Sequence, residues 1–259
     1  MSAVLYERRG PATWITINRP KYRNAIDREA AGMLCRFFQQ AIDDDQCMAI
    51  VLTGSGDEAF CAGGDLRVDA EGSPVRVDIA RPLHPIVDLF KLIETCTKPV
   101  VARVNGHAMG AGFGLVCAAD IAICADHVKL GAPETKRGFA PMIIMPHMLR
   151  IVPRRRLLEM CITGEPWSAA EAMEIGIVNY IAPSAELDDK LAWMLGRIVD
   201  KSPTGIRLGK FAFHGMADMP LKESLDFALA MMPRMLHSED AREGLRAFFE
   251  KRKPEWTGN

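Results

Sequence analysis

Two short runs of small residues in this chain are suited to holding a negatively charged oxygen. The first is Ala59-Phe60-Cys61-Ala62-Gly63-Gly64-Asp65, and the second is Asn105-Gly106-His107-Ala108-Met109-Gly110-Ala111-Gly112. Each follows an apolar, β-branched run, at 49–53 and 100–104, so each is predicted to be a loop at the end of a buried strand. Such loops expose backbone N–H groups. Two of them aimed at one point would hold a carbonyl oxygen that gains negative charge.

The elements that must position these loops alternate along the first half of the chain, which favours an α/β fold with a largely buried sheet. A strand at 13–18 and the strand at 49–53 flank a predicted helix at 27–44, for which Asp27 is a plausible N-cap. A helix at 111–119 follows the second loop directly. The positive end of its dipole would face the same point as the loop N–H groups.

The second half of the chain contains more predicted helix than the first half. Strand-like sequence at 121–124 and 128–130 is followed by Ser168 and Glu171, whose spacing predicts a capping box and a helix start. A last short strand is predicted at 176–181, and everything from residue 185 onward is predicted to be helical. The charged section 67–82 is expected to be a loop or short helix bordering the site.

Composition excludes several classes of function. The chain has 259 residues, about half of them hydrophobic, and a formal charge of −1 with its basic residues dispersed, so no nucleic-acid partner is expected. The apolar run 115–125 is interrupted by Asp120 and is too short for a membrane span. The seven cysteines lack Cys-x-x-Cys spacing, which predicts reduced thiols and a cytoplasmic protein. No cluster has metal-ligand spacing, so no metal is expected.

The chain resembles the crotonase family, the enoyl-CoA hydratases and isomerases, along essentially its whole length. The resemblance rests on motifs in a matching order: Asn18-Arg19-Pro20, Asn24-Ala25, Phe60 to Leu66, Asn105-Gly106, Gly110-Ala111-Gly112, Pro133-Glu134 and Lys251-Arg252-Lys253-Pro254. It implies a crotonase-like spiral of ββα units over 1–195 and a helical trimerisation region over 196–259. A homotrimer or a dimer of trimers is the assembly that it implies.

The resemblance also implies a coenzyme A thioester as substrate and no separate cofactor, because coenzyme A is part of the substrate. It assigns the two oxyanion donors to the backbone N–H groups of Ala62 and Ala111, and proton transfer to Glu134. The oxyanion assignment is chemically consistent, because hydration of a conjugated thioester passes through an enolate-like oxyanion.

Further substrate contacts are expected around these three residues. Arg23 resembles the basic position that meets the nucleotide phosphates, and Lys251 and Lys253 resemble a pair that reaches the 3′-phosphate, often of a neighbouring subunit. Acyl-pocket residues are predicted to be Leu66, Met109, Phe139 and Pro141. The remaining predicted contacts are Ala25, Cys61, Gly63, Asp65 and Gly110. His107 is expected to pack under its loop, and Asp120 to fix a loop through backbone hydrogen bonds.

Gly114 is the main departure from the family pattern, because many hydratases carry a first catalytic glutamate there. One carboxylate suits movement of a proton along the acyl chain, which raises a double-bond isomerase as the alternative. Some hydratases that resemble the methylglutaconyl-CoA branch also have glycine at this place, and the run from Glu134 to Ile144 is similar to theirs. We therefore expect a 2-enoyl-CoA hydratase. An acyl-CoA-binding scaffold without catalysis is a third possibility, and a glutamate installed at Gly114 is expected to help hydration if the backbone tolerates it.

Overall fold

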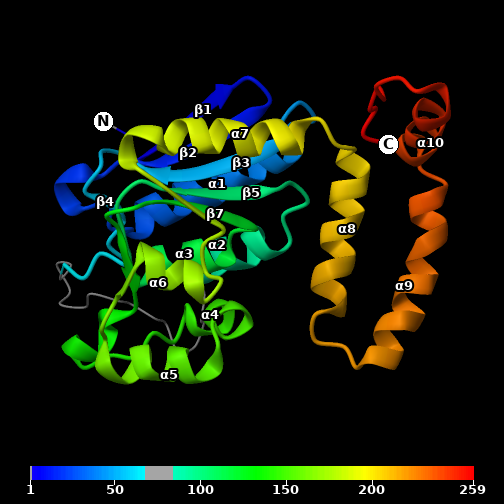
Figure 1. Cartoon of the computed structure of the whole chain (residues 1–259). Coiled ribbons are helices and arrows are strands. Elements are labelled where there is room, and N and C mark those ends of the chain that lie inside the picture. The colour runs from blue at the N-terminus through cyan, green and yellow to red at the C-terminus, as the bar shows by residue number, and fades with distance from the viewer. Residues whose placement is uncertain (1, 68–83) are drawn as a thin grey trace.

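Two sheets form the body of the protein. The computed structural model describes residues 2–67 and 84–259 (Figure 1). The larger sheet is ordered β1-β2-β3-β5-β7-β10 and is parallel except for the β1–β2 pair. Its strands are β1 (Val4–Arg9), β2 (Ala12–Ile17), β3 (Ala49–Gly54), β5 (Val100–Val104), β7 (Ile121–Ala125) and β10 (Tyr180–Ala182).

A smaller sheet, ordered β4-β6-β8-β9, carries the chain ends that approach the site. Its strands are β4 (Ala59–Cys61), β6 (His107–Met109), β8 (Lys129–Gly131) and β9 (Trp167–Ser168). Three times the chain passes from a strand of the large sheet to one of the small sheet: β3 to β4, β5 to β6 and β7 to β8. This repeat confirms the predicted spiral of ββα units, and the large-sheet strand β3 is buried at every position, as its apolar run predicts.

Helices cover the sheets of this body. They are α1 (Arg28–Asp43), α2 (Pro85–Glu94), α3 (Ala111–Ala118), α4 (Met145–Ile151), α5 (Arg154–Thr163), α6 (Ala169–Glu174) and α7 (Leu187–Val199), with 3-10 turns η1 (Pro20–Tyr22), η2 (Pro133–Arg137) and η3 (Ser184–Glu186). Two predicted caps are confirmed: the Asp27 side chain accepts from Ala30 N–H, and Ser168 and Glu171 form a capping box.

The predicted strand at 176–181 is only partly right, since β10 begins at Tyr180. Gly176, at φ +81°, ends α6 in the left-handed conformation, and Ile177 donates its N–H back to Ala172 O. The helix end therefore uses the residues that would have started the strand. The charged section 67–82 lies outside the described residues, apart from Arg67.

The last three helices stand beside the body (Figure 1): α8 (Pro203–Met216), α9 (Leu221–Leu236) and α10 (Glu239–Glu250). Lys210 of α8 joins them to the body by pairing with Asp120 and donating to Lys98 O. Asp240, which is buried, accepts hydrogen bonds from Ser202 Oγ and from the N–H groups of Thr257 and Gly258. The C-terminal segment is thus tied to the starts of α8 and α10. Among residues 2–67 and 84–259, no helix is long and apolar enough to cross a membrane.

Candidate active site

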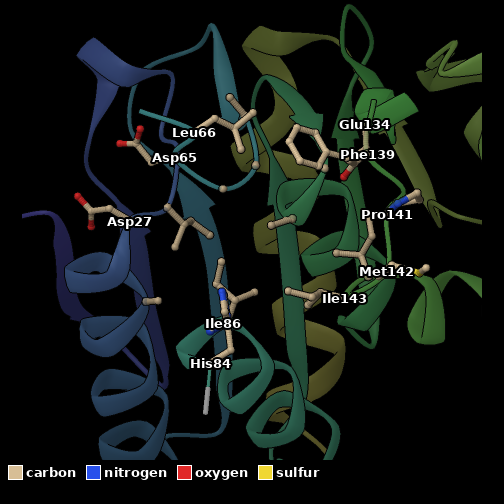
Figure 2. Close-up of a pocket in the computed structure, with 18 of the residues that line it drawn as sticks. Asp27, Asp65, Leu66, His84, Ile86, Glu134, Phe139, Pro141, Met142 and Ile143 are labelled. Carbon is tan, nitrogen blue, oxygen red and sulfur yellow. Dashed lines mark hydrogen bonds between the residues drawn. The ribbon is translucent and has the colours of Figure 1, made fainter. Parts of the chain in front are cut away.

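A cavity of about 860 Å³ opens where several element ends converge. Its walls are the loop after β4, the first turns of α1, α2 and α3, and η2 with the segment that follows it. Figure 2 shows Glu134 and Phe139 on one side and Leu66, Asp65 and Asp27 on the other, with Ile86 and His84 farther along. The predicted residues that line the cavity are Ala62, Gly63, Asp65, Leu66, Gly110, Ala111, Glu134, Phe139 and Pro141.

The two small-residue loops approach each other at glycines. Gly63 has φ +103° and Gly110 has φ +54°, both in the region that glycine adopts without strain. A Cβ built on Gly63 would lie 3.1 Å from Met109 O and 3.5 Å from Ala111 N. The absence of side chains therefore lets the loop after β4 lie directly against the start of α3.

The hydrogen bonds of the first loop determine which of its backbone N–H groups is available to a ligand. Ala62 donates its N–H to Arg23 O at 3.0 Å, and Asp65 donates to Ile26 O at 2.9 Å. Gly63 donates to Cys61 Sγ, whereas the N–H of Gly64 has no acceptor among the residues described, and Gly64 lines the cavity. The Ala62 N–H, which was expected to be the donor, is therefore already used within the chain. The N–H of Gly64 is the one that this loop leaves without an acceptor among the described residues.

The second donor keeps its predicted position. Ala111 is the first residue of α3, where an N–H lacks an intrahelical acceptor, and no acceptor for it is found in the described chain. The preceding Gly110 is anchored through its N–H to Gly131 O at 2.9 Å. The start of α3 also adds the positive end of its dipole. Gly64 and Ala111 thus offer the cavity two backbone donors from facing loops.

Glu134 lies in the same corner. A Cβ at Gly110 would be only 3.0 Å from Glu134 Oε1, so this carboxylate lies against the residue before Ala111. Its other oxygen, Oε2, is buried and has no hydrogen-bond partner within the described structure. Burial raises the pKa of Glu134, opposed by a backbone hydrogen bond and by the charge of Arg137. Such a carboxyl is suited to both accept and return a proton.

Gly114 leaves no room for a second carboxylate. A Cβ at this position would lie 2.7 Å from Ile144 Cβ and 2.9 Å from Phe90 Cζ, and Ile144 itself lines the cavity. The wall next to α3 is therefore apolar. The expected benefit of a glutamate at Gly114 depended on a tolerant backbone neighbourhood, and the packing contradicts that condition.

Other predicted contacts lie outside the cavity wall. Arg23 is exposed and its Nε pairs with Glu58 at 2.9 Å, and Cys61 is fully buried in β4. Lys251 and Lys253 follow α10, a helix that stands beside the body (Figure 1), and neither lysine lines the cavity. Of the predicted set, the residues absent from the cavity wall are Arg23, Ala25, Cys61, Met109, Lys251 and Lys253.

Two residues that were expected to have supporting roles accept backbone hydrogen bonds, although His107 lies at the start of β6 and is only half-buried. His107 accepts the Lys129 N–H on its Nδ1 at 3.1 Å, and Asp120 accepts the Val100 N–H at 2.7 Å. Residues that motif spacing missed are at the starts of α1 and α2, including Asp27, Arg28, His84 and Ile86. They belong to no shared motif, and only the topology brings these two helix starts to one cavity.

Comparison with known proteins gives one family. The family model described as Enoyl-CoA hydratase/isomerase matches residues 8–259. A carnitinyl-CoA dehydratase of Escherichia coli O157:H7 is 37% identical over 260 residues, covering 97% of each chain. The structure of enoyl-CoA hydratase from Mycobacterium tuberculosis H37Rv is similar at 30% identity and TM-score 0.89 over all of both chains. Human enoyl Coenzyme A hydratase domain-containing protein 3 has a TM-score of 0.91 at 29% identity, covering 98% of this chain and 100% of its own.

A side chain at Gly114 is predicted to destabilise the protein. Because Ile144 and Phe90 fill the space, Gly114→Ala should lower the free energy of unfolding by about 1–3 kcal/mol, and Gly114→Glu by more. Chemical denaturation measures both. Gly209→Ala in α8 is the matched control, since a Cβ there meets nothing within 4 Å. Ile144→Ala combined with Gly114→Ala should cost less than the sum of the two single changes. If the double variant instead loses the full sum of the two single changes in the free energy of unfolding, the two sites do not compete for space.

The buried carboxyl of Glu134 predicts a pH-dependent stability difference. Its folded pKa lies above the ordinary value of 4.5, so the folded state retains a proton that the unfolded state has lost, and stability falls as pH rises through this window. Glu134→Gln does not titrate there. The Tm of Glu134→Gln relative to that of the wild type should therefore increase as the pH rises above about 4.5, until the folded carboxyl has ionised. Exposed Glu174→Gln should show no such growth, and a constant gap for Glu134→Gln would contradict the burial effect.

Proposed function

The chain belongs to the enoyl-CoA hydratase/isomerase family, and we propose that it adds water across the conjugated double bond of a 2-enoyl-CoA thioester. The same site would remove water from the 3-hydroxyacyl-CoA in the reverse direction. The observation that carries this proposal is the position of Glu134 against Gly110, in a cavity that the two backbone donors, Gly64 and Ala111, also line. Relatives named as hydratases and as dehydratases support it, since these names describe one reaction in two directions.

In the proposed reaction, Glu134 accepts a proton from water while the water oxygen bonds to the β-carbon. The π electrons of the double bond shift to the thioester oxygen, which becomes an enolate held by the N–H groups of Gly64 and Ala111. The enolate then collapses, and the α-carbon takes the proton from Glu134. The thioester is restored, and the net change is addition of one water.

A single carboxylate performs both proton transfers in this scheme. Ile144 and Phe90 occupy the place beside Gly114, so no second acid is available from that position. The raised pKa of Glu134 favours this double use, because its protonated form is easier to regenerate than that of an exposed glutamate. The isomerase alternative uses the same groups without water. The scaffold alternative does not account for a buried carboxyl placed against the donors.

Recognition of coenzyme A is proposed for the basic residues outside the cavity. Arg23 is exposed, and it carries the carbonyl that fixes the loop after β4, so a phosphate at its guanidinium would lie near the cavity. Lys251 and Lys253 would serve a neighbouring subunit.

No separate cofactor is proposed. The seven cysteines are unpaired thiols, five of them buried, which supports a reducing cytoplasm as the location.

We propose that the chain assembles as a homotrimer or a dimer of trimers through its helical C-terminal region. No residue of α9 is buried, and large apolar side chains are exposed on all three helices. The exposed set includes Phe211, Phe213, Leu225, Leu229, Phe248 and Phe249. Exposed large apolar side chains on three successive helices support burial of this surface against further copies.

Replacement of Glu134 by glutamine is predicted to remove catalysis and leave binding intact. Turnover of crotonyl-CoA should fall by at least about a hundredfold, because general acid–base catalysis is lost. Calorimetry with acetoacetyl-CoA should show little change in affinity. With the wild type in ¹⁸O-labelled water, the label should appear on the β-carbon hydroxyl. If the wild type converts a 3-enoyl-CoA to its conjugated isomer and neither substrate acquires label, the isomerase replaces the hydratase.

The apolar helical surface predicts a trimer or hexamer in solution. Light scattering after size-exclusion chromatography should give three or six times the 28.6 kDa chain mass. Phe248→Asp combined with Phe249→Asp should shift the wild-type species toward smaller assemblies, because two charges would enter the interface. Asp substitution of exposed Glu7 is the control and should change nothing. A wild type that runs as a stable monomer at assay concentration contradicts the assembly.

A further inference from the structure

We propose that Arg19 is a positioning residue for the oxyanion donor Gly64. This inference rests on the proposed function, since Gly64 is a donor only if the cavity holds a thioester. Arg19 lies just before η1, with only 9% of its side chain exposed. Its guanidinium contacts Asp27 Oδ2 at 2.6 Å and Asp65 Oδ2 at 3.0 Å, and it also donates to Ala25 O.

The two carboxylates contacted by Arg19 belong to different walls of the cavity. Asp27 is the N-cap of α1, and Asp65 directly follows Gly64. A buried guanidinium is stable only with such partners, so the cluster fixes the loop after β4 relative to the start of α1. The hydrogen bonds from Arg67, together with Arg19, lower the pKa of Asp65 to about 2. The link from Asp65 to Arg19 is therefore charged at any working pH.

The backbone between Arg19 and Asp27 transmits this link to Gly64. Its residues 23–26 run alongside the loop: Ala62 N–H donates to Arg23 O, Ile26 N–H donates to Gly63 O and Asp65 N–H donates to Ile26 O. In this pairing, the loop uses the N–H groups of Ala62 and Asp65. The N–H of Gly64, which lies between them, takes no part in it. A shift of segment 23–26 would therefore move the donor.

Segment 23–26 depends on outside support because its turn is strained. Arg23 and Asn24 have φ of 51° and 56°, the left-handed region that residues with a Cβ rarely adopt. Asn24 Oδ1 accepts the N–H of Arg19 at 2.9 Å, and its Nδ2 donates to Ser55 O. Arg19 thus holds the turn through its backbone and the loop through its side chain.

Loss of this support should affect the enolate more than the ground state. The charge on the thioester oxygen develops only in the reaction, so misplacement of its donor lowers kcat. Affinity for a saturated thioester falls less, because only Arg23 of the proposed coenzyme A contacts lies in segment 23–26, whereas most of the apolar cavity wall, Lys251 and Lys253 lie outside it. Removal of one oxyanion donor typically costs about 10²–10³ in kcat, and displacement of a donor by about 1 Å has effects of the same order.

The test compares Arg19→Gln and Arg19→Lys with wild type in three measurements. These are kcat and KM for crotonyl-CoA, the fraction of bound acetoacetyl-CoA present as enolate by its ultraviolet absorption, and calorimetric affinity for saturated butyryl-CoA. Arg19→Gln should lower kcat about a hundredfold and reduce the enolate fraction, with butyryl-CoA affinity within about threefold of wild type. Arg19→Lys, which keeps the charge, should recover part of both losses.

Arg8→Gln is the matched control. Arg8 also links a strand to α1, by pairing with Asp44 at 3.0 Å, but at the opposite end of that helix. Arg8→Gln should therefore leave kcat and the enolate fraction unchanged. If Arg19→Gln does not fold, Asp65→Asn removes the same link from the loop side and is judged by the same criteria.

Two results would overturn the role of Arg19. One is a kcat and enolate fraction near wild type, and the other is a loss of butyryl-CoA affinity as large as the loss of kcat, which would indicate general structural damage. The enolate measurement requires binding but no turnover. A wild type that ionises acetoacetyl-CoA and hydrates no enoyl-CoA would therefore refute the proposed function alone, and the enolate fraction of Arg19→Gln would still decide this inference.

Discussion

The close approach of two backbones, at residues 62–65 and 110–112, is the constraint on which the rest of the site depends. A side chain on Gly63 would press against Met109 O, and one on Gly112 would lie 2.7 Å from Cys61 Cβ. The approach is possible because β4 and β6 are neighbouring parallel strands whose ends meet at one sheet edge. Large-sheet strands β3 and β5 pair in the same order, so the fold brings both loops to one place before any ligand arrives.

Sequence patterns predicted the loops and the strands before them, because apolar periodicity and small-residue runs are local signals. Glu134 was predicted only through the resemblance to the family. The patterns did not predict which N–H in the first loop is available. Ala62 and Gly64 are two positions apart in one motif, and only the pairing with Arg23 and Ile26 distinguishes them. Likewise, the sequence at Gly114 shows a missing acid but not the reason, since Ile144 and Phe90 come from distant segments. The contribution of the starts of α1 and α2 to the cavity wall was missed for the same reason.

The body and the helical C-terminal region use apolar residues differently. In the body, apolar side chains of the sheets and of α1 to α3 are buried, and the site is formed at their ends. In α8 to α10, many face outward, while buried carboxylates organise the interior: Asp240 accepts from the C-terminal segment and Glu243 pairs with Arg246 and Arg252. Internal order in this region thus depends on charged hydrogen bonds, which leaves its apolar area available for contact with other copies.

The packing of Ile144 against Gly114 has an evolutionary consequence. Residues 114 and 144 form an epistatic pair, because a larger residue at one position is acceptable only after the other has become smaller. An acidic side chain at position 114 introduced before residue 144 has become smaller would give a less stable protein, so the order of the two changes matters. The local packing therefore restricts which residue types positions 114 and 144 can accept together.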